Sequence, residues 1–343
     1  MRLIFENNNV EWRQTMINED HSVSLKAVFL LLKFGLIRTV LFLIVILLQS
    51  IPVEAGIRLI GASPLFQIHG MLRRPSDIAV SKSGRIYVVD GVNHQIRLYD
   101  SKGNETGSFG TKGTEKGELF RPLGIDLDAN GNVYIADSGN HRIQIFNSEG
   151  SCLKVIAVPS VTAKPSDPVD VAVDENARIL YAVDNDNHTI KRYNLATEKW
   201  SSSFGEPGSG KREFKYPFLI ALDSEWYLYI VDVINTRVQV LSSEGRYVTE
   251  IGGWGVEKGE FYRPKGVALD TKQRVYVSDS FMGVIQIFKR TGELIGAVGD
   301  LKNEAVMRFK TPIGIWIDVH NKLYVAEMFA DTVSVFLLAD EPE

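Results

Sequence analysis

This sequence of 343 residues has a single cysteine, no large excess of one charge and no long apolar run. The single cysteine, Cys152, excludes an internal disulfide framework and a cysteine-based metal site, because both need several cysteines. It also lies too far from the N-terminus to be the lipid-bearing cysteine of a bacterial lipoprotein. The net charge is −4, and the chain after residue 55 carries 33 Lys and Arg against 37 Asp and Glu. A domain that binds nucleic acid usually has a basic excess, so the composition argues against that class.

The longest uninterrupted apolar run, Val40–Leu48, has only nine residues. It is the last part of a longer apolar segment, residues 27–48, which Lys33 and Arg38 interrupt. A membrane-spanning helix needs about 20 apolar residues, whereas the core of a signal peptide needs roughly 7 to 15. The basic residues precede the run, which places residues 1–26 in the cytoplasm and sends the rest of the chain across the membrane.

This segment predicts either a signal peptide over residues 27–55 or an uncleaved signal anchor. The small residues Val53 and Ala55 favour cleavage after Ala55, whereas the long stretch before the apolar run favours an anchor. Met16 as the true start would shorten that stretch. Both alternatives make the rest of the chain extracytoplasmic, either periplasmic or secreted, and the second anchors it in the inner membrane through residues 27–48.

From residue 71 onward the chain consists of six similar units, which start near residues 71, 119, 164, 214, 261 and 309. A proline marks the start of each unit: Pro75, Pro122, Pro168, Pro217, Pro264 and Pro312. A tyrosine marks the middle of each unit: Tyr87, Tyr134, Tyr181, Tyr229, Tyr276 and Tyr324. Both series advance by 46 to 49 residues, so two independent markers indicate one repeat.

Each unit contains three short runs of apolar and β-branched residues with turn residues between them, as in Ile125–Leu127, Val133–Ala136 and Ile143–Phe146. A fourth run follows, such as Tyr247–Ile251. A single four-stranded sheet cannot bury two apolar faces, so neighbouring sheets must stack radially. The pattern predicts an all-β fold, a six-bladed β-propeller over residues 56–338, preceded by one N-terminal hydrophobic helix and followed by an acidic tail, residues 339–343.

The two ends of the repeat region complement each other. The sixth unit ends after its third run, near Leu338, whereas a spare run, Ile57–Ile60, precedes the first unit. Because a ring removes its exposed strand edges by such an exchange, we expect Ile57–Ile60 to pair near Val333–Leu337 and to close the last blade.

The repeats resemble the NHL family over about residues 57–338. The second unit has the NHL pattern almost complete: Pro122, Gly124, Ile125, Tyr134, Asp137, Asn140, His141, Arg142 and Ile143. No unit has the Trp-Asp ending of WD40 repeats or the repeated Gly-Gly start of kelch repeats. The resemblance implies a monomeric, rigid interaction platform.

Two sets of repeated polar residues are candidates for chemistry. Three histidines occupy one repeat position: His94, His141 and His188. Six carboxylates end the second run of each unit: Asp90, Asp137, Asp184, Asp232, Asp279 and Glu327. Because the repeat itself places them there, we interpret the histidines as turn residues that bond to backbone, and we expect each carboxylate to hold its own turn by accepting backbone N–H bonds. We predict neither metal nor cofactor.

Residues that break the repeat are better candidates for a functional site. Asp77 and Asp170 replace the expected glycine two residues after the proline, where the first strand approaches the channel. They are the predicted first ligands of a channel-bound Ca²⁺ if the chain is a hydrolase or lyase similar to lactonase propellers. Peptide-amidating lyases, which resemble this fold, have zinc-binding histidines just after such prolines, whereas this chain has Ser76, Leu123, Val169, Phe218, Lys265 and Ile313.

A basic residue precedes the proline in five of the six units: Arg74, Arg121, Lys215, Arg263 and Lys310. These cations are either ordinary solvated side chains or a ring at the channel mouth that attracts an anionic ligand.

The turns between the second and third runs change character along the chain. They are polar in the first three units, Gly91–His94, Ser138–His141 and Asn185–His188. In the last three units they are apolar: Val233, Ile234, Phe281, Met282, Met328 and Phe329. Either these six side chains form an apolar patch that docks a partner, or some of them fold inward between the blades.

The leading hypothesis is therefore a non-enzymatic, extracytoplasmic binding module for a protein, peptide or glycan partner. The alternative is the Ca²⁺-dependent hydrolase or lyase that uses the channel. RNA binding, known in some animal NHL proteins, conflicts with the predicted export and with the charge.

Overall fold

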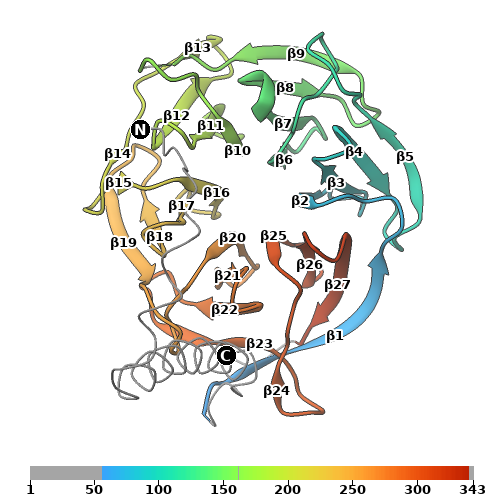
Figure 1. The fold of residues 1–343 in the computed structure, drawn as a ribbon, viewed down its shortest axis with the longest axis vertical. Helices are drawn as coiled ribbons and strands as arrows, with labels where there is room; N and C mark the ends of the chain where they lie inside the picture. Colours follow the sequence, from blue (N-terminus) through green and yellow to red (C-terminus); the bar gives the residue numbers. More distant parts are fainter. Residues whose placement is uncertain (1–55, 161, 340–343) are drawn as a thin grey trace, which may run out of the picture. The chain divides into compact units, whose positions relative to one another are not determined.

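The computed structural model describes residues 56–160 and 162–339, which form six sheets arranged as blades around one axis (Figure 1). The predicted six-bladed propeller is confirmed. The segment 27–48, with its predicted helix and cleavage site, lies outside the described residues, as does most of the acidic tail. Within the described ranges no helix is long and apolar enough to cross a membrane.

Each blade consists of four strands that follow one another from the axis outward. Blade one contains β2 (Pro75–Val80), β3 (Ile86–Asp90), β4 (Gln95–Tyr99) and β5 (Glu105–Phe109), and blade two contains β6 (Ile125–Leu127), β7 (Val133–Asp137), β8 (Arg142–Phe146) and β9 (Cys152–Ala157). Blade three contains β10 (Pro168–Asp174), β11 (Ile179–Asp184), β12 (Thr189–Asn194) and β13 (Lys199–Trp200), and blade four contains β16 (Pro217–Leu222), β17 (Leu228–Asp232), β18 (Arg237–Leu241) and β19 (Tyr247–Gly252).

Blade five contains β20 (Pro264–Leu269), β21 (Val275–Asp279), β22 (Val284–Phe288) and β23 (Leu294–Asp300), and blade six contains β25 (Pro312–Ile317), β26 (Lys322–Glu327), β27 (Thr332–Leu338) and, outermost, β1 (Leu59–Ile68). The remaining short elements are β14 (Glu206–Pro207), β15 (Glu213–Phe214), β24 (Ala305–Val306) and the 3₁₀ turn η1 (Ser138–Asn140).

The second strand of each blade is buried on both faces, because it lies between two neighbouring blades. Side chains alternate between the faces of a strand, so β17 contributes to two cores. Leu228 and Ile230 pack toward Tyr181 of blade three. Tyr229 and Val231 pack in the other core, with β21 of blade five. The radial stacking that the repeats predicted therefore supplies the hydrophobic core.

An N-terminal strand closes the ring, as predicted, but with other residues than expected. In β1, Ala62–Ile68 pairs antiparallel with β27 of blade six, from Ala62 opposite Leu338 to Ile68 opposite Val333. Leu59–Gly61 instead pairs in parallel with Ala297–Gly299 of blade five. The prediction that Ile57–Ile60 would pair with β27 was wrong, because β1 is ten residues long and bridges two blades.

Candidate functional site

The prolines that start the blades and the turns between second and third strands lie on one side of the ring, which we call the proline face. The six turn carboxylates hold this face together. Each accepts a hydrogen bond of 2.6–3.0 Å from the backbone N–H of the residue 17 positions earlier, in the loop that leads into the same blade. The carboxylates do bond to backbone, but the expected backbone N–H bonds within the same turn occur only at Asp279 among the six, and the bonds that all six share go to the loop that precedes the blade.

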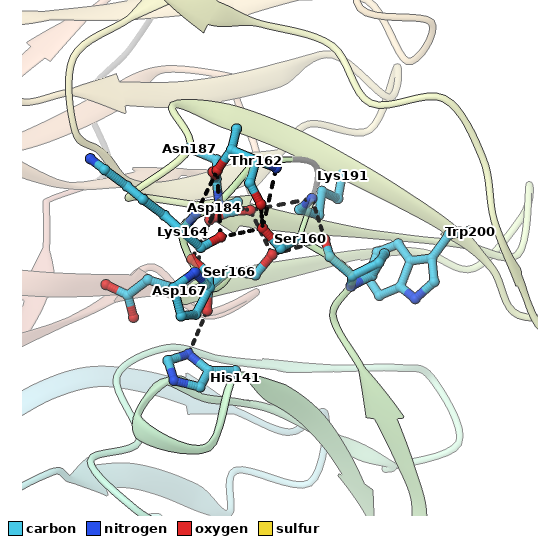
Figure 2. Close-up of polar contacts among 12 residues, drawn as sticks. His141, Ser160, Thr162, Lys164, Ser166, Asp167, Asp184, Asn187, Lys191 and Trp200 are labelled. Atoms are coloured by element: carbon cyan, nitrogen blue, oxygen red, sulfur yellow. Dashed lines mark hydrogen bonds and ion pairs between the residues drawn. The ribbon is translucent and has the colours of Figure 1, made fainter.

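Blade three shows this arrangement in detail (Figure 2). The fully buried carboxylate of Asp184 accepts bonds from the Ser166 hydroxyl at 2.8 Å, the Asp167 N–H at 3.0 Å and the Asn187 amide at 2.9 Å. The ammonium of Lys191 lies 3.3 Å away and is itself buried. Similar ion pairs to a turn carboxylate occur in blades one, two and four: Arg97 with Asp90, Arg142 with Asp137, and Arg237 with Asp232.

The three histidines connect consecutive blades. Nδ1 of His94 accepts the N–H of Arg121 at 3.0 Å, and Nδ1 of His188 accepts the N–H of Tyr216 at 3.1 Å. Nδ1 of His141 lies 2.6 Å from the carbonyl oxygen of Ser166 (Figure 2). In each case the histidine bonds to the backbone of the next blade, which agrees with a structural role. Within the described residues, no three His, Cys, Asp or Glu side chains are grouped as a metal site would require.

Asp77 and Asp170 form a second set of links between blades, close to the axis. Asp77 accepts the N–H of Ile125 at 3.1 Å, and Asp170 accepts the N–H of Ile220 at 2.8 Å. A Cβ on Gly314 would overlap the other oxygen of Asp77, and one on Gly124 would overlap that of Asp170. Glycine at this position in blades six and two therefore makes room for the aspartate of the next blade.

The environment of these two carboxyls does not fit a calcium ion. Burial raises the pKa of Asp77 to about 8, and burial together with the Asp77 carboxyl raises that of Asp170. One oxygen of each accepts a backbone N–H, and Oδ1 of Asp170 is buried without a hydrogen-bond partner. Ca²⁺ takes six to eight oxygen ligands, many of them charged. One oxygen of each carboxyl already bonds to backbone, and no third His, Cys, Asp or Glu side chain of the described residues is grouped with them, so we derive no step through Ca²⁺.

Stability should therefore depend on pH through Asp77. Its folded pKa lies above the unfolded value of 3.8, so the folded state binds the extra proton between about pH 4 and pH 8. The free energy of unfolding should fall as the pH rises through this window. We expect a lower melting temperature at pH 8.5 than at pH 5.5, and a smaller difference in the D77N variant, whose amide does not ionise. An equal difference in both proteins would contradict the raised pKa.

The five basic residues that precede a blade-starting proline, which we call the rim cations, are all exposed. Arg263 alone among them lines a pocket on the proline face. Arg74 instead lies over the Phe329 ring, with its guanidinium carbon 5.8 Å from the ring centre. The structure thus places Arg121, Lys215 and Lys310 on the surface without bringing them into that pocket.

The six apolar turn residues differ in their exposure to solvent. Ile234, Phe281 and Phe329 are 60%, 59% and 67% exposed. Val233 is buried in the core between blades four and five, so its predicted surface position was wrong. Met282 and Met328 are half-buried. The turn of blade one, which we described as polar, also exposes Val92.

The pocket has a volume of about 370 Å³. It is formed by residues of blades two to five: Leu123, Asp167, Val169, Asn185, Tyr216, Phe218, Val233, Ile234, Arg263 and Lys265. The ammonium of Lys265 lies 4.2 Å from the centre of the Phe218 ring. Burial and the nearby Arg263 lower the pKa of Lys265 to about 8. Sequence reasoning missed this lysine, although it is the only basic residue directly after a blade-starting proline.

A comparison of the sequence with known protein families also finds repeats in this chain. The NHL repeat family matches residues 72–99 and 121–146, in blades one and two. The chain contains NHL repeats. No curated protein sequence matches it.

Several solved structures share the fold of this NHL propeller. A streptogramin B lyase has a TM-score of 0.60 at 13% identity, covering 80% of this chain and 97% of that chain. A catalytically inactive virginiamycin B lyase from Staphylococcus aureus has a TM-score of 0.57 at 15% identity, covering 79% and 82%. A gluconolactonase from Xanthomonas campestris has a TM-score of 0.61 at 12% identity, covering 84% and 97%. At these identities the likeness shows a common fold only.

Proposed function

We propose that this NHL propeller is a non-enzymatic binding module that docks a protein or peptide partner on its proline face, over blades four to six. The observation that carries the proposal is the exposure of Ile234, Phe281 and Phe329 at turns of three consecutive blades. Exposed aromatic side chains are enriched at the centres of protein interfaces.

Neighbouring side chains support an interface of mixed character. The Phe281 ring stacks on Tyr262, with ring centres 4.1 Å apart, and Tyr262 is itself 41% exposed. Trp254, in the loop that leads into blade five, is 77% exposed, the highest value among the exposed large apolar side chains of the described residues. Arg74 lies over the Phe329 ring, so an acidic group on a partner would have a cation beside this apolar group, and the match would increase the association rate.

The location of this module outside the cytoplasm is part of the proposal. It rests on the apolar segment 27–48 and on the basic residues before the run at Val40–Leu48. The test is to sequence the N-terminus of the mature protein from fractionated cells. Cleavage after Ala55, or the intact chain in the membrane fraction, agrees with export, whereas an intact chain in the cytoplasmic fraction contradicts it.

Docking is tested by replacing Phe281 and Phe329 together with serine. Both side chains are mostly exposed, so the free energy of unfolding should change by less than about 1 kcal/mol. Capture of the partner from the exported fraction should be lost, because both apolar anchors are missing.

The control for docking is V319S on the opposite face. Val319 is 66% exposed, close to the value for Phe329, and lies in the turn between the first and second strands of the same blade. A protein that wild type and V319S retain but F281S/F329S loses identifies the docking partner. Equal capture by all three proteins would refute this interface, and a large fall in melting temperature would show that the two rings belong to the core.

A further inference from the structure

The pocket on the proline face combines an apolar floor with one cationic wall. Leu123, Val169 and Phe218 each follow the proline of a different blade and together form an apolar lining near the axis. In blade five the same position is Lys265, and Arg263 lies two residues before it. A volume of about 370 Å³ lies in the range of small-ligand pockets, near its lower end.

Neither cation of this wall is paired with an anion of the described residues, although the Asp167 carboxyl lines the same pocket. No ion pair or hydrogen bond joins the side chain of Lys265 or Arg263 to another described residue, and the ammonium of Lys265 instead faces the Phe218 ring. Two cations in one partly buried pocket repel each other, and this repulsion helps to lower the pKa of Lys265. An anion bound between them would remove the repulsion and form charge-assisted hydrogen bonds.

Asp167 and Asn185 add polar groups to the lining of the pocket. Asp167 bonds to the Ser138 hydroxyl, and the Asn185 side chain donates to the carbonyl oxygen of Pro217 at 2.7 Å. The amide oxygen of Asn185 and the Asp167 carboxyl can accept an N–H from a ligand. The pocket thus offers partners for a carboxylate, an adjacent N–H and an apolar side chain.

We propose that this pocket binds the free C-terminus of a peptide whose last residue is apolar. The terminal carboxylate contacts Lys265 and Arg263, the last N–H faces Asp167 or Asn185, and the last side chain packs on Leu123, Val169 and Phe218. This inference rests on the proposed function, because the pocket includes the exposed Ile234 of the docking surface. The inference specifies which part of the partner is recognised, namely its free C-terminus.

The test uses synthetic hexapeptides of one sequence that end in Leu, Phe or Ser, each as the free acid and as the C-terminal amide. We expect free acids ending in Leu or Phe to bind the full chain at least tenfold more tightly than their amides and than the Ser peptide. In the K265M variant, which keeps an unbranched side chain of similar size and removes its charge, the preference for the acid should fall at least tenfold. The control is K310M, because Lys310 is an exposed cation of the proline face that does not line the pocket.

Acid and amide peptides that bind equally would overturn the proposal, as would an unchanged preference in K265M. N-acetyl-leucine that binds as tightly as the hexapeptide ending in Leu would also overturn it, since the site would then take a small carboxylate rather than a chain end. Capture that F281S/F329S loses but K265M retains would leave the docking face intact and refute only the recognition of a C-terminus.

The pH dependence of binding gives a second readout. The other charged or titratable groups that line the pocket are Arg263, Asp167 and Tyr216. A bound carboxylate favours the charged form of Lys265, so the affinity for the free acid should fall as the pH rises above about 8. The K265R variant keeps its charge and should bind with little change between pH 7 and pH 9. An equal fall in K265R would assign the effect to another group and contradict the role of Lys265.

Discussion

A chain that begins at Leu72 will melt about 10 °C below one that begins at Gly56, because it lacks β1. This strand completes blade six and also pairs with β23 of blade five. It buries Ile60 and Ile68 almost completely, and each isoleucine contributes about 1.5–3 kcal/mol. Each kcal/mol shifts the melting temperature of a domain of this size by roughly 2 °C or more. Exposed edges of β27 and β23 should also promote association between chains.

The measurement is thermal unfolding of both chains, with light scattering to detect association. The chain that begins at Gly56 is the control, since it lacks the N-terminal segment but keeps β1. Equal melting temperatures would show that the ring closes without the strand. A smaller test on the complete chain is I60S, which should lower the melting temperature, whereas L65S should not, because Leu65 is 44% exposed.

Replacing Asp184 with alanine will destabilise the propeller by about 3–5 kcal/mol. The change leaves the buried ammonium of Lys191 without its carboxylate, and removing one partner of a buried ion pair has this cost. The N–H of Asp167 and the hydroxyl of Ser166 also lose an acceptor (Figure 2). Urea unfolding measures the loss, and D186A in the same turn is the control, because Asp186 is only half-buried.

A second change identifies the cause of this loss. Adding K191M to D184A removes the unpaired charge, so the double variant should be more stable than the sum of the single changes predicts. If the two effects are simply additive, the ion pair is not the source of the loss and the lost hydrogen bonds at Ser166 and Asp167 account for it.

Much of the fold could be predicted because the same pattern of strands and turns occurs in six units of the sequence. Prolines and tyrosines at one period fix the register of the blades, and the tyrosine of each second strand is buried in every blade. The exact pairing of β1 could not be predicted, because Ile57–Ile60 and Leu65–Ile68 both contain apolar residues able to form an edge strand. The contacts of β1 with two different blades decide the register.

The candidate site was predicted only in part. The exposed turn residues Ile234, Phe281 and Phe329 were found from the sequence, but the same reasoning placed Val233 beside them on the surface. Adjacent residues of a tight turn can point to opposite sides, and the neighbouring blade provides a core position for one of them. Asp77 and Asp170 were identified as departures from the repeat, but their partners lie on the next blade and have no signal in the local sequence.

The sequence by itself determined the number of blades and the order of strands, because these are local properties that each unit repeats. Only the tertiary structure decided which residues form the pocket. Leu123, Val169, Phe218 and Lys265 stand 46 to 49 residues apart in the chain, and they meet because the first strands of all blades converge on one axis. The packing of blade five on blade four also half-buries Lys265 beside Phe218, a contact that no single repeat contains, and this burial together with the nearby Arg263 lowers the pKa of the lysine.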